Sequence, residues 1–346
     1  MRTSQIFPKI FLFKQPSGTS RGVMTQKKSW FIKLIDNHES GWGECSIIEK
    51  LSPDYQDDHT YSQHLTHFLK LWQENTLEPA ELNLFPSIKF GIEMAILDLK
   101  TGGKQTLFDT TFTRSEEKIK INGLIWMSNP ESMRQQIRTK IDLGFSCIKL
   151  KIGALAWQEE FAILKELRQQ FSRHDIELRV DANGAYSFEQ APEILENLAS
   201  LHVHSIEQPI HVGQLEKMSE LCSSTPCPIA LDEELIGVSN LLNKQLLLEK
   251  ICPQYIILKP SLHGGISGTK DWIDLAEQNN VAWWMTSALE SNLGLNAIAQ
   301  LASTYVLKIP QGLGTGALYE TNIPSPLFLD KEWLGFDKNE QFELQF

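Results

Sequence analysis

The spacing of apolar residues divides the chain into two parts. In the first hundred residues, apolar strand patterns are followed by helical patterns, without alternation between the two. We expect strands at 6–14, 29–36 and 42–48 and helices at 59–76 and 86–100. This order is typical of a small α+β domain. Asp98, on the second of these helices, is expected to be a surface or capping group.

The segment between the first two strands, residues 15–28, is polar, glycine-rich and basic. Taken alone, it is typical of a solvent-exposed hairpin loop. The alternative is a mobile lid that brings Arg21 or a lysine to an anionic substrate, because loops on a rigid scaffold often carry binding residues and close over sites. The residues of this segment by themselves favour the exposed loop.

From about residue 118 the pattern changes to short apolar runs that alternate with amphipathic helical stretches. The runs are 121–126, 147–152, 177–182, 202–207, 228–233, 254–259, 281–286 and 304–309, with helical patterns that include 157–171, 188–200, 212–223 and 290–303. Eight strands at regular intervals fit a TIM-type (β/α) barrel. An open doubly wound sheet is the alternative. Closure is favoured by the eight strands and by the lack of a G-x-G-x-x-G motif after the first of them.

Composition narrows the class of protein. Of 346 residues, 42% are hydrophobic and 22% are charged, close to the averages of globular proteins. Apolar runs are far too short for a membrane span and the N-terminus lacks a signal-peptide pattern, so we expect a cytoplasmic protein with no membrane partner. The formal net charge of −11 argues against a nucleic-acid partner but permits small anionic substrates. The 5 cysteines lack C-x-x-C spacing and fit reduced thiols.

Charged residues recur at the carboxyl ends of the predicted barrel strands. A parallel strand buried on both faces should be apolar, yet these ends carry Lys149, Lys151, Asp181, Glu207, Asp232 with Glu233, and Lys259. Each alone has an ordinary explanation, since a lysine there often extends along the surface and an aspartate often caps the next helix. Together they lie in register at the rim where barrel active sites form, which favours a functional site.

Three of these residues, Asp181, Glu207 and Asp232, are carboxylates from adjacent strands. Unpaired carboxylates at one rim would repel one another and raise each other's pKa values. A hard divalent cation removes that cost, and oxygen ligands suit Mg²⁺, for which Mn²⁺ can substitute. Such an ion can bind a substrate carboxylate and stabilise the charge of an enediolate. We therefore expect a magnesium site here.

The lysines of the rim suggest proton transfer. Lys149 and Lys151 are two positions apart, so both point to one face of their strand. Two adjacent ammonium groups near a metal depress each other's pKa, which makes one of them a candidate general base near neutral pH. Lys259 comes from the sixth strand, across the barrel. Arg179 also points inward, where it could hold a second carboxylate or pair with a neighbour.

Short motifs recur in a fixed order along the chain. They are WGECS at 42–46, KLK at 149–151, VDANGAY at 180–186, IEQP at 206–209, LDEE at 231–234 and LKP at 258–260. This set resembles the enolase superfamily, in its muconate-lactonizing subgroup, over essentially the whole chain. The resemblance implies a (β/α)7β barrel over 118–316 and an α+β capping domain over 1–115, with 317–346 packing back on the latter.

By the same resemblance, Asp181, Glu207 and Asp232 would be the Mg²⁺ ligands. Lys151 would be the base on one face of the substrate, with Lys259 on the opposite face. Gly18–Thr25 would be the mobile lid, which reverses the preference drawn from that segment alone.

Two segments narrow the choice within the subgroup. The run 281–286 is not followed by the His of mandelate-racemase-like members, and Gly312–Gly316 lacks the Asp-x-Asp of dipeptide epimerases. The chain looks most like the o-succinylbenzoate synthases, which dehydrate a small cyclohexadiene carboxylate in menaquinone biosynthesis. N-acylamino acid racemase, dipeptide epimerase and muconate cycloisomerase are the alternatives. The substrate-binding candidates are Arg179, Asn183, Ser287, Glu290, Ser291, Gly314, Thr315, Ser20 and Arg21, and the catalytic candidates are Lys151, Lys259 and Lys149.

Two other classes of function stay open. A non-catalytic barrel, structural or sugar-binding, predicts no dependence on a divalent cation and gives no reason for paired lysines. A lyase that forms a Schiff base with a lysine would need a phosphate site after the seventh or eighth strand, which Gly312–Gly316 could supply. Assembly into a homo-oligomer is also left open.

Overall fold

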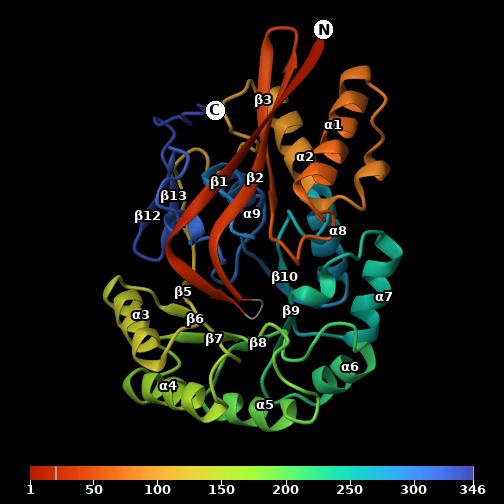
Figure 1. The fold of residues 1–346 in the computed structure, drawn as a ribbon. Coiled ribbons are helices and arrows are strands. Elements are labelled where there is room, and N and C mark those ends of the chain that lie inside the picture. Colours follow the sequence, from red (N-terminus) through yellow and green to blue (C-terminus); the bar gives the residue numbers. More distant parts are fainter. Residues whose placement is uncertain (20–21, 346) are drawn as a thin grey trace.

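The computed structural model describes residues 1–19 and 22–345, with the backbone alone for residues 17–19. Its first part is an antiparallel sheet of β1 (Arg2–Thr19), β2 (Gly22–Asp36) and β3 (Glu39–Ile47). Helices α1 (Asp58–Glu74) and α2 (Pro86–Lys100) pack beside this sheet, with a short 3₁₀ turn η1 (Pro79–Leu82) between them (Figure 1). The order of strands before helices confirms the α+β pattern expected here.

The first hairpin is longer than the apolar pattern predicts. Strands β1 and β2 pair from Arg2 opposite Asp36 to Thr19 opposite Gly22, with an irregularity between Leu12 and Ser17. The expectation of a loop over 15–28 is therefore wrong for most of that segment. Backbone pairing continues through it although most of its side chains are exposed and polar, so no apolar alternation marks these residues as strand. The hairpin reaches down from the N-terminal sheet toward the strands of the second part (Figure 1).

Glycines let β3 lie directly on the backbone of α2. A Cβ atom on Gly43 would lie 1.9 Å from the carbonyl oxygen of Gly91, and one on Gly41 would lie 2.1 Å from that of Ala95. Asp98 is part of this contact and is fully buried, so the expectation of a surface group is wrong. Its carboxylate accepts hydrogen bonds from the backbone nitrogen of Trp42 (2.9 Å) and from the backbone and side-chain nitrogens of Gln105.

The second part is a curled sheet of seven parallel strands that follow one another in chain order. They are β5 (Gly123–Ile125), β6 (Cys147–Lys151), β7 (Glu177–Asp181), β8 (Ser205–Glu207), β9 (Ile229–Leu231), β10 (Tyr255–Leu258) and β11 (Ala282–Met285). The helices are α3 (Pro130–Asp142), α4 (Trp157–Gln170), α5 (Ala191–Ser200), α6 (Leu215–Ser224), α7 (Leu241–Ile251), α8 (Gly265–Gln278) and α9 (Asn292–Ala302), with the 3₁₀ turns η2 (Glu233–Leu235) and η3 (Thr315–Ala317). Helices α3 to α7 lie around the outside of the sheet (Figure 1).

The prediction of an eighth strand at 304–309 is wrong. The chain makes isolated parallel bridges a few residues later, from Gln311 to Ile121 and from Gly312 to Thr286, beside the two end strands of the sheet. The side chain of Gln311 also accepts a hydrogen bond from the backbone nitrogen of Met285 at 2.8 Å. The apolar run before it mimics a strand in sequence, but Val306 within the run is 86% exposed.

The end of the chain returns to both parts. Strands β12 (Leu327–Asp330) and β13 (Trp333–Phe336) form a sheet with β4 (Ile119–Lys120). Just before them, Lys14 donates its backbone N–H to Leu318 and Glu320 donates to Leu12, which ties this segment to β1. The division of the chain near residues 115–118 and 316–317 stays a prediction.

Two glutamates of the N-terminal part cap helices of the second part. Glu44 on β3 accepts hydrogen bonds from the backbone nitrogens of Ser291 (3.0 Å) and Gly294 (2.9 Å) at the start of α9. Glu93 on α2 accepts from the backbone nitrogen of Ser267 (3.2 Å) at the start of α8 and from its hydroxyl. A carboxylate satisfies the free N–H groups and the positive end of the dipole at a helix N-terminus, so both contacts hold the two parts together.

The described helices are all too short or too polar to cross a bilayer. The cysteines are free thiols, as the lack of C-x-x-C spacing predicts, and only Cys252 among them is exposed.

Candidate active site

The charged side chains at the strand ends come together because the neighbouring strands are in register. Lys151 on β6 is the Cα partner of Asp181 on β7, which is in turn the partner of Glu207 on β8. Partners on parallel strands point to the same face of the sheet. One layer further down, Lys149 is paired with Arg179. Lys151, Asp181 and Glu207 therefore lie side by side at the carboxyl ends of their strands.

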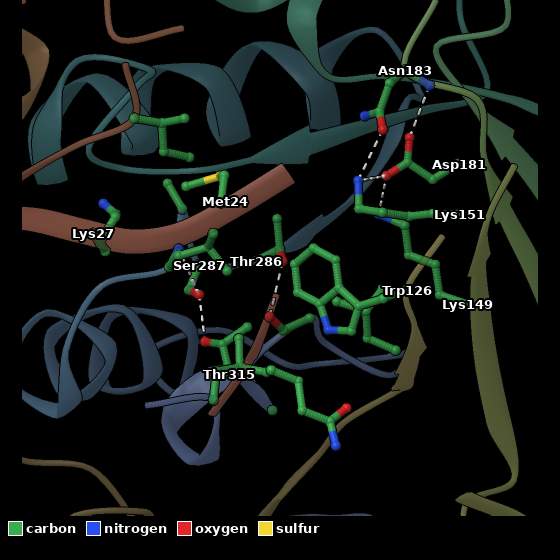
Figure 2. A pocket seen from close by; sticks show the side chains of 18 of the residues that line it. Met24, Lys27, Trp126, Lys149, Lys151, Asp181, Asn183, Thr286, Ser287 and Thr315 are labelled. Carbon is green, nitrogen blue, oxygen red and sulfur yellow. Dashed lines mark hydrogen bonds and ion pairs between the residues drawn. The ribbon is translucent and has the colours of Figure 1, made fainter. Parts of the chain in front are cut away.

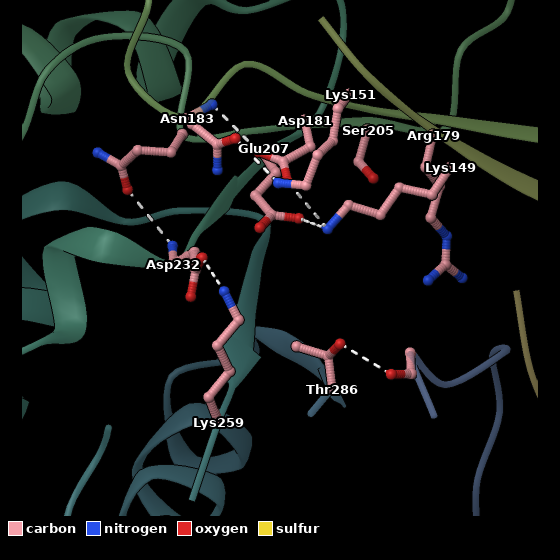
Figure 3. Close-up of polar contacts among 12 residues, drawn as sticks. Lys149, Lys151, Arg179, Asp181, Asn183, Ser205, Glu207, Asp232, Lys259 and Thr286 are labelled. Carbon is pink, nitrogen blue, oxygen red and sulfur yellow. Dashed lines mark hydrogen bonds and ion pairs between the residues drawn. The ribbon is translucent and has the colours of Figure 1, made fainter. Parts of the chain in front are cut away.

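Every carboxylate of the trio is paired with a lysine (Figure 3). Lys151 Nζ lies 2.9 Å from Asp181 Oδ2, and Lys149 Nζ lies 3.3 Å from the same oxygen and also donates to Glu207. Lys259 approaches from the opposite side and donates to Asp232. The site is therefore a compact network of three ammonium and three carboxylate groups.

This network shifts pKa values in ways that sequence spacing does not predict. Burial alone would lower the pKa of Lys149, but the carboxylates of Asp181 and Glu207 outweigh burial and raise it. Asp232 raises the pKa of Lys259 in the same way. The expectation that adjacent ammonium groups near a metal depress each other's pKa stays a prediction, since here the carboxylates dominate the pKa of Lys149. Nearby anions stabilise the charged lysine more than the second cation destabilises it.

The carboxylates respond in opposite directions. Burial raises the pKa of Asp181, but Lys149 and Lys151 outweigh it and lower that pKa below its usual value. Lys259 lowers the pKa of Asp232 against the effect of burial. Burial, reinforced by Asp181, raises the pKa of Glu207 well above its usual value. Glu207 is thus the one carboxylate of the three whose pKa is raised.

The donor set fits a divalent metal ion. Glu207 Oε1 and Asp232 Oδ1 are buried and have no hydrogen-bond partner among the described residues. Buried charged oxygens without partners are costly, and a cation would satisfy both of them. Among the described residues, no three metal-ligating side chains are already gathered around one point, because each carboxylate turns toward a lysine. Binding of an ion therefore requires some of these ion pairs to loosen.

A cavity of about 860 Å³ opens above the network. Lys149, Lys151, Asp181 and Lys259 line one side of it, and residues of β2 from Gly22 to Lys28 line another. Of the predicted substrate-binding residues, Asn183, Ser287 and Thr315 line this cavity (Figure 2). Gly314 lines it as well. Asn183 donates to Glu233 and accepts from Lys151 at 2.9 Å, and Ser287 is hydrogen-bonded to Thr315.

Three other predicted residues lie elsewhere in the described part of the chain. Arg179 does not line the cavity; its guanidinium is buried, paired with Glu177 and bonded to the carbonyl oxygen of Pro310. Of the two alternatives for Arg179, the pairing with a neighbour is the one observed. Glu290 and Ser291 are buried between the two parts, where Glu290 accepts from Ser261 and Ser291 donates to Glu44.

The predicted lid is described only in part. Ser20 and Arg21 lie outside the described residues, whereas Gly22, Val23, Met24 and Thr25 line the cavity. Closure of this segment over a ligand stays a prediction.

Some residues of the site escaped sequence reasoning. Lys27 on β2 lines the cavity and is only 2% exposed. Trp126 lines it as well, with its ring 5.9 Å from Lys151 Nζ. The run from Gln26 to Ser29 is polar throughout, so no apolar alternation in the sequence marks Lys27 as a buried residue.

Comparison with known proteins agrees with this geometry. Residues 132–318, more than half of the chain, match the family described as enolase C-terminal domain-like. The chain belongs to the enolase superfamily. Residues 17–99 match the MenC N-terminal domain, which places the α+β part of the chain in the same superfamily architecture.

Individual relatives match this superfamily member over almost its whole length. An o-succinylbenzoate synthase of Desulfotalea psychrophila is 44% identical, over 94% of this chain and 96% of its own. The crystal structure of MenC from Desulfotalea psychrophila LSv54 matches with a TM-score of 0.84 and 39% identity, over 96% of this chain and 99% of its own. A substrate-liganded L-Ala-D/L-Glu epimerase of Bacillus subtilis matches with a TM-score of 0.84 at 19% identity, over 97% and 96%, which shows a shared fold.

Proposed function

We propose that this chain is a Mg²⁺-dependent dehydratase, an o-succinylbenzoate synthase of menaquinone biosynthesis. The observation that carries the proposal is the pair of lysines, Lys151 and Lys259, on opposite sides of a buried trio of carboxylates at one wall of the cavity. A relative with that activity, 44% identical over nearly the whole chain, supports the choice of reaction. The substrate is then a cyclohexadiene carboxylate that carries a succinyl group.

The first step assigned to the chain is removal of the proton next to the substrate carboxylate. Lys151 Nζ lies at the cavity wall, held 2.9 Å from both Asp181 and Asn183. In its neutral form, Lys151 takes the proton. A positioned base accelerates such a proton transfer by about 100-fold or more. Lys259, whose pKa Asp232 raises, stays protonated and stabilises the negative charge from the opposite face.

The second step is loss of water. Lys151, now protonated, returns the proton to the departing hydroxyl group on the same face, so one C–H and one C–O bond break and the ring becomes aromatic. Asp181, Glu207 and Asp232 would hold Mg²⁺. When bound, Mg²⁺ supplies positive charge that stabilises the carboxylate as its negative charge increases. Lys149 also lines the cavity and positions Asp181 and Glu207 through its ion pairs.

The remaining expectations belong to the same proposal. The curled sheet with its bridges at Gln311 and Gly312 is taken as a (β/α)7β barrel. Gly18–Thr25 is proposed as the lid, a small carboxylate as the ligand and the cytoplasm as the location, with Mn²⁺ able to substitute for Mg²⁺. Assembly into a homo-oligomer stays open.

The test is an activity assay with the dehydration substrate, followed by the loss of conjugated-diene absorbance, beside N-succinyl amino acids and dipeptides. We expect dehydration that EDTA abolishes and Mg²⁺ restores. Full activity in metal-free buffer would contradict the metal assignment, and turnover of dipeptides alone would contradict the choice of substrate.

Lysine variants test the division of roles. Lys151→Ala should lose at least ~100-fold in rate, the low end for general acid–base catalysis. The matched control is Lys165→Ala, an exposed lysine on α4, which should leave the rate unchanged. Lys259→Ala should also abolish racemisation of any N-succinyl amino acid while Lys151 still exchanges the α-proton of one enantiomer. Near-normal turnover by Lys151→Ala would show that another residue is the base.

A further inference from the structure

The proposed reaction gives a product with two carboxylates. One carboxylate of o-succinylbenzoate lies on the ring, and the other ends the four-carbon side chain. The ring carboxylate belongs beside the lysines and carboxylates at the strand ends, where the proton is removed. The second carboxylate must lie at some distance from that point, and burying it without a partner would be costly. The cavity therefore needs a second cationic group away from the first.

Lys27 is placed for this role. It lines the cavity from β2, on the side away from Lys151 and Asp181, with Met24 and Ser287 lying between in the view of Figure 2. Its side chain is almost entirely removed from solvent. A buried lysine that borders a ligand cavity keeps its charge out of water, so an anion that enters the cavity interacts with it strongly.

Lys27 has a hydroxyl as its hydrogen-bond partner, and two carboxylates, Glu290 and Glu44, act on its charge. Its Nζ donates to the neutral hydroxyl of Ser46. Of the two nearest carboxylates, Glu44 accepts hydrogen bonds from the start of α9, and Glu290 accepts one from Ser261. Burial outweighs both of them and lowers the pKa of Lys27 to about 8. A further carboxylate at this point would favour the charged ammonium.

Other lysines along the cavity are less suited. Lys28 donates to Asp58 at 3.1 Å and forms an ion pair with Glu49 at 3.1 Å, so carboxylates already hold its charge. The ammonium group of Lys140 already lies over an aromatic ring, with its Nζ 5.0 Å from the ring centroid of Phe145. Lys50 is exposed to solvent, where an ion pair adds little free energy of binding.

We propose that Lys27 binds the side-chain carboxylate of the succinyl group and thereby makes the cavity selective for dicarboxylates. This inference rests on the proposed function for the identity of the ligand. It assigns to β2, in the N-terminal part, the recognition of the substrate end that does not react. Lys27 is thus a specificity residue, whereas the lysines at the strand ends act on the reacting carbon.

The test compares two ligands of the Mg²⁺-loaded protein, o-succinylbenzoate and its side-chain methyl ester, by calorimetry. The wild-type protein should bind the diacid about 10- to 100-fold more tightly than the ester, as expected for one charge-assisted hydrogen bond. Lys27→Met should remove that preference by weakening the diacid alone, and Lys27→Arg should restore part of it. The matched control, Lys28→Met, should keep the wild-type preference.

Several results would overturn the proposal. The first is equal affinity of the wild-type protein for the diacid and the ester. The second is an equal loss of affinity for both ligands in Lys27→Met. The third is a loss of the preference for the diacid in Lys28→Met. If Lys27→Met fails to fold, Lys27→Arg and Lys28→Met still test the assignment, because part of the preference should remain in the first and all of it in the second. Failure of the proposed function is a separate result, since it would appear as no dehydration by the wild-type protein.

Discussion

Glu44→Gln is expected to weaken the contact between the N-terminal sheet and α9. The carboxylate accepts hydrogen bonds through one oxygen from Ser29 Oγ (2.7 Å) and the Ser291 backbone nitrogen (3.0 Å), and through the other from Ser291 Oγ (2.6 Å) and the Gly294 backbone nitrogen (2.9 Å). Glutamine keeps one oxygen and replaces the other with a donor. Hydroxyl groups can turn to accept from that donor, but a backbone N–H cannot.

The magnitude follows from that geometry. In either orientation of the new side-chain amide, one backbone N–H at the start of α9 loses its acceptor, which costs roughly 1–3 kcal/mol when the group is buried. The loss of the negative charge at the helix N-terminus adds about 0.3–1 kcal/mol. We therefore expect the free energy of unfolding to fall by roughly 1–4 kcal/mol.

The assay is urea unfolding followed by fluorescence, with the free energy of unfolding obtained by linear extrapolation. The matched control is Glu39→Gln, at the exposed start of the same strand, which should change that free energy by less than about 0.5 kcal/mol. A Glu44→Gln protein as stable as this control would refute the view that Glu44 joins the two parts of the molecule.

Three further predictions concern the metal, the packing and the pH dependence. Asp232→Asn should weaken Mg²⁺ binding roughly tenfold or more, because it removes a charged ligand; calorimetry without substrate measures this, and an unchanged dissociation constant would contradict the assignment. Gly43→Ala should lower the free energy of unfolding by about 1–3 kcal/mol through overpacking against α2. The control is Gly102→Ala, because a Cβ atom there would meet nothing within 4 Å and the only cost is the strain of its positive φ. If Gly43→Ala and Gly102→Ala gave equal unfolding curves, the close contact between β3 and α2 would be contradicted. Burial raises the pKa of Asp98 to about 6 from 3.8, so the folded state binds this proton more tightly than the unfolded state does. The free energy of unfolding of the wild type, minus that of Asp98→Asn, should therefore fall as pH rises from 4 to 6. Urea unfolding at several pH values measures this difference, and a constant difference would contradict the assignment of Asp98.

Local patterns in the sequence were enough to place the charged side chains that gather at the strand ends. Apolar runs gave seven of the parallel strands, and a charged residue at the end of a buried strand has few structural explanations. Because parallel strands of one sheet share a carboxyl edge, Lys151, Asp181 and Glu207 had to lie together once the strands were known. The same reasoning could not give their protonation, since a pKa depends on every charge nearby and not on spacing along one strand.

Contacts between distant segments settled the rest. Glu290 and Ser291 follow the strand β11 in the sequence, as site residues often follow a strand. Ser291 nevertheless donates to Glu44 of the N-terminal sheet, in the contact between the two parts. Lys27 has the sequence context of an exposed hairpin, yet that hairpin lies against the cavity. The closing segment at Gln311 pairs through isolated bridges, too short to leave an apolar period. A periodic pattern reports only which face of an element is buried, and the group that covers that face is chosen by the packing of the whole chain.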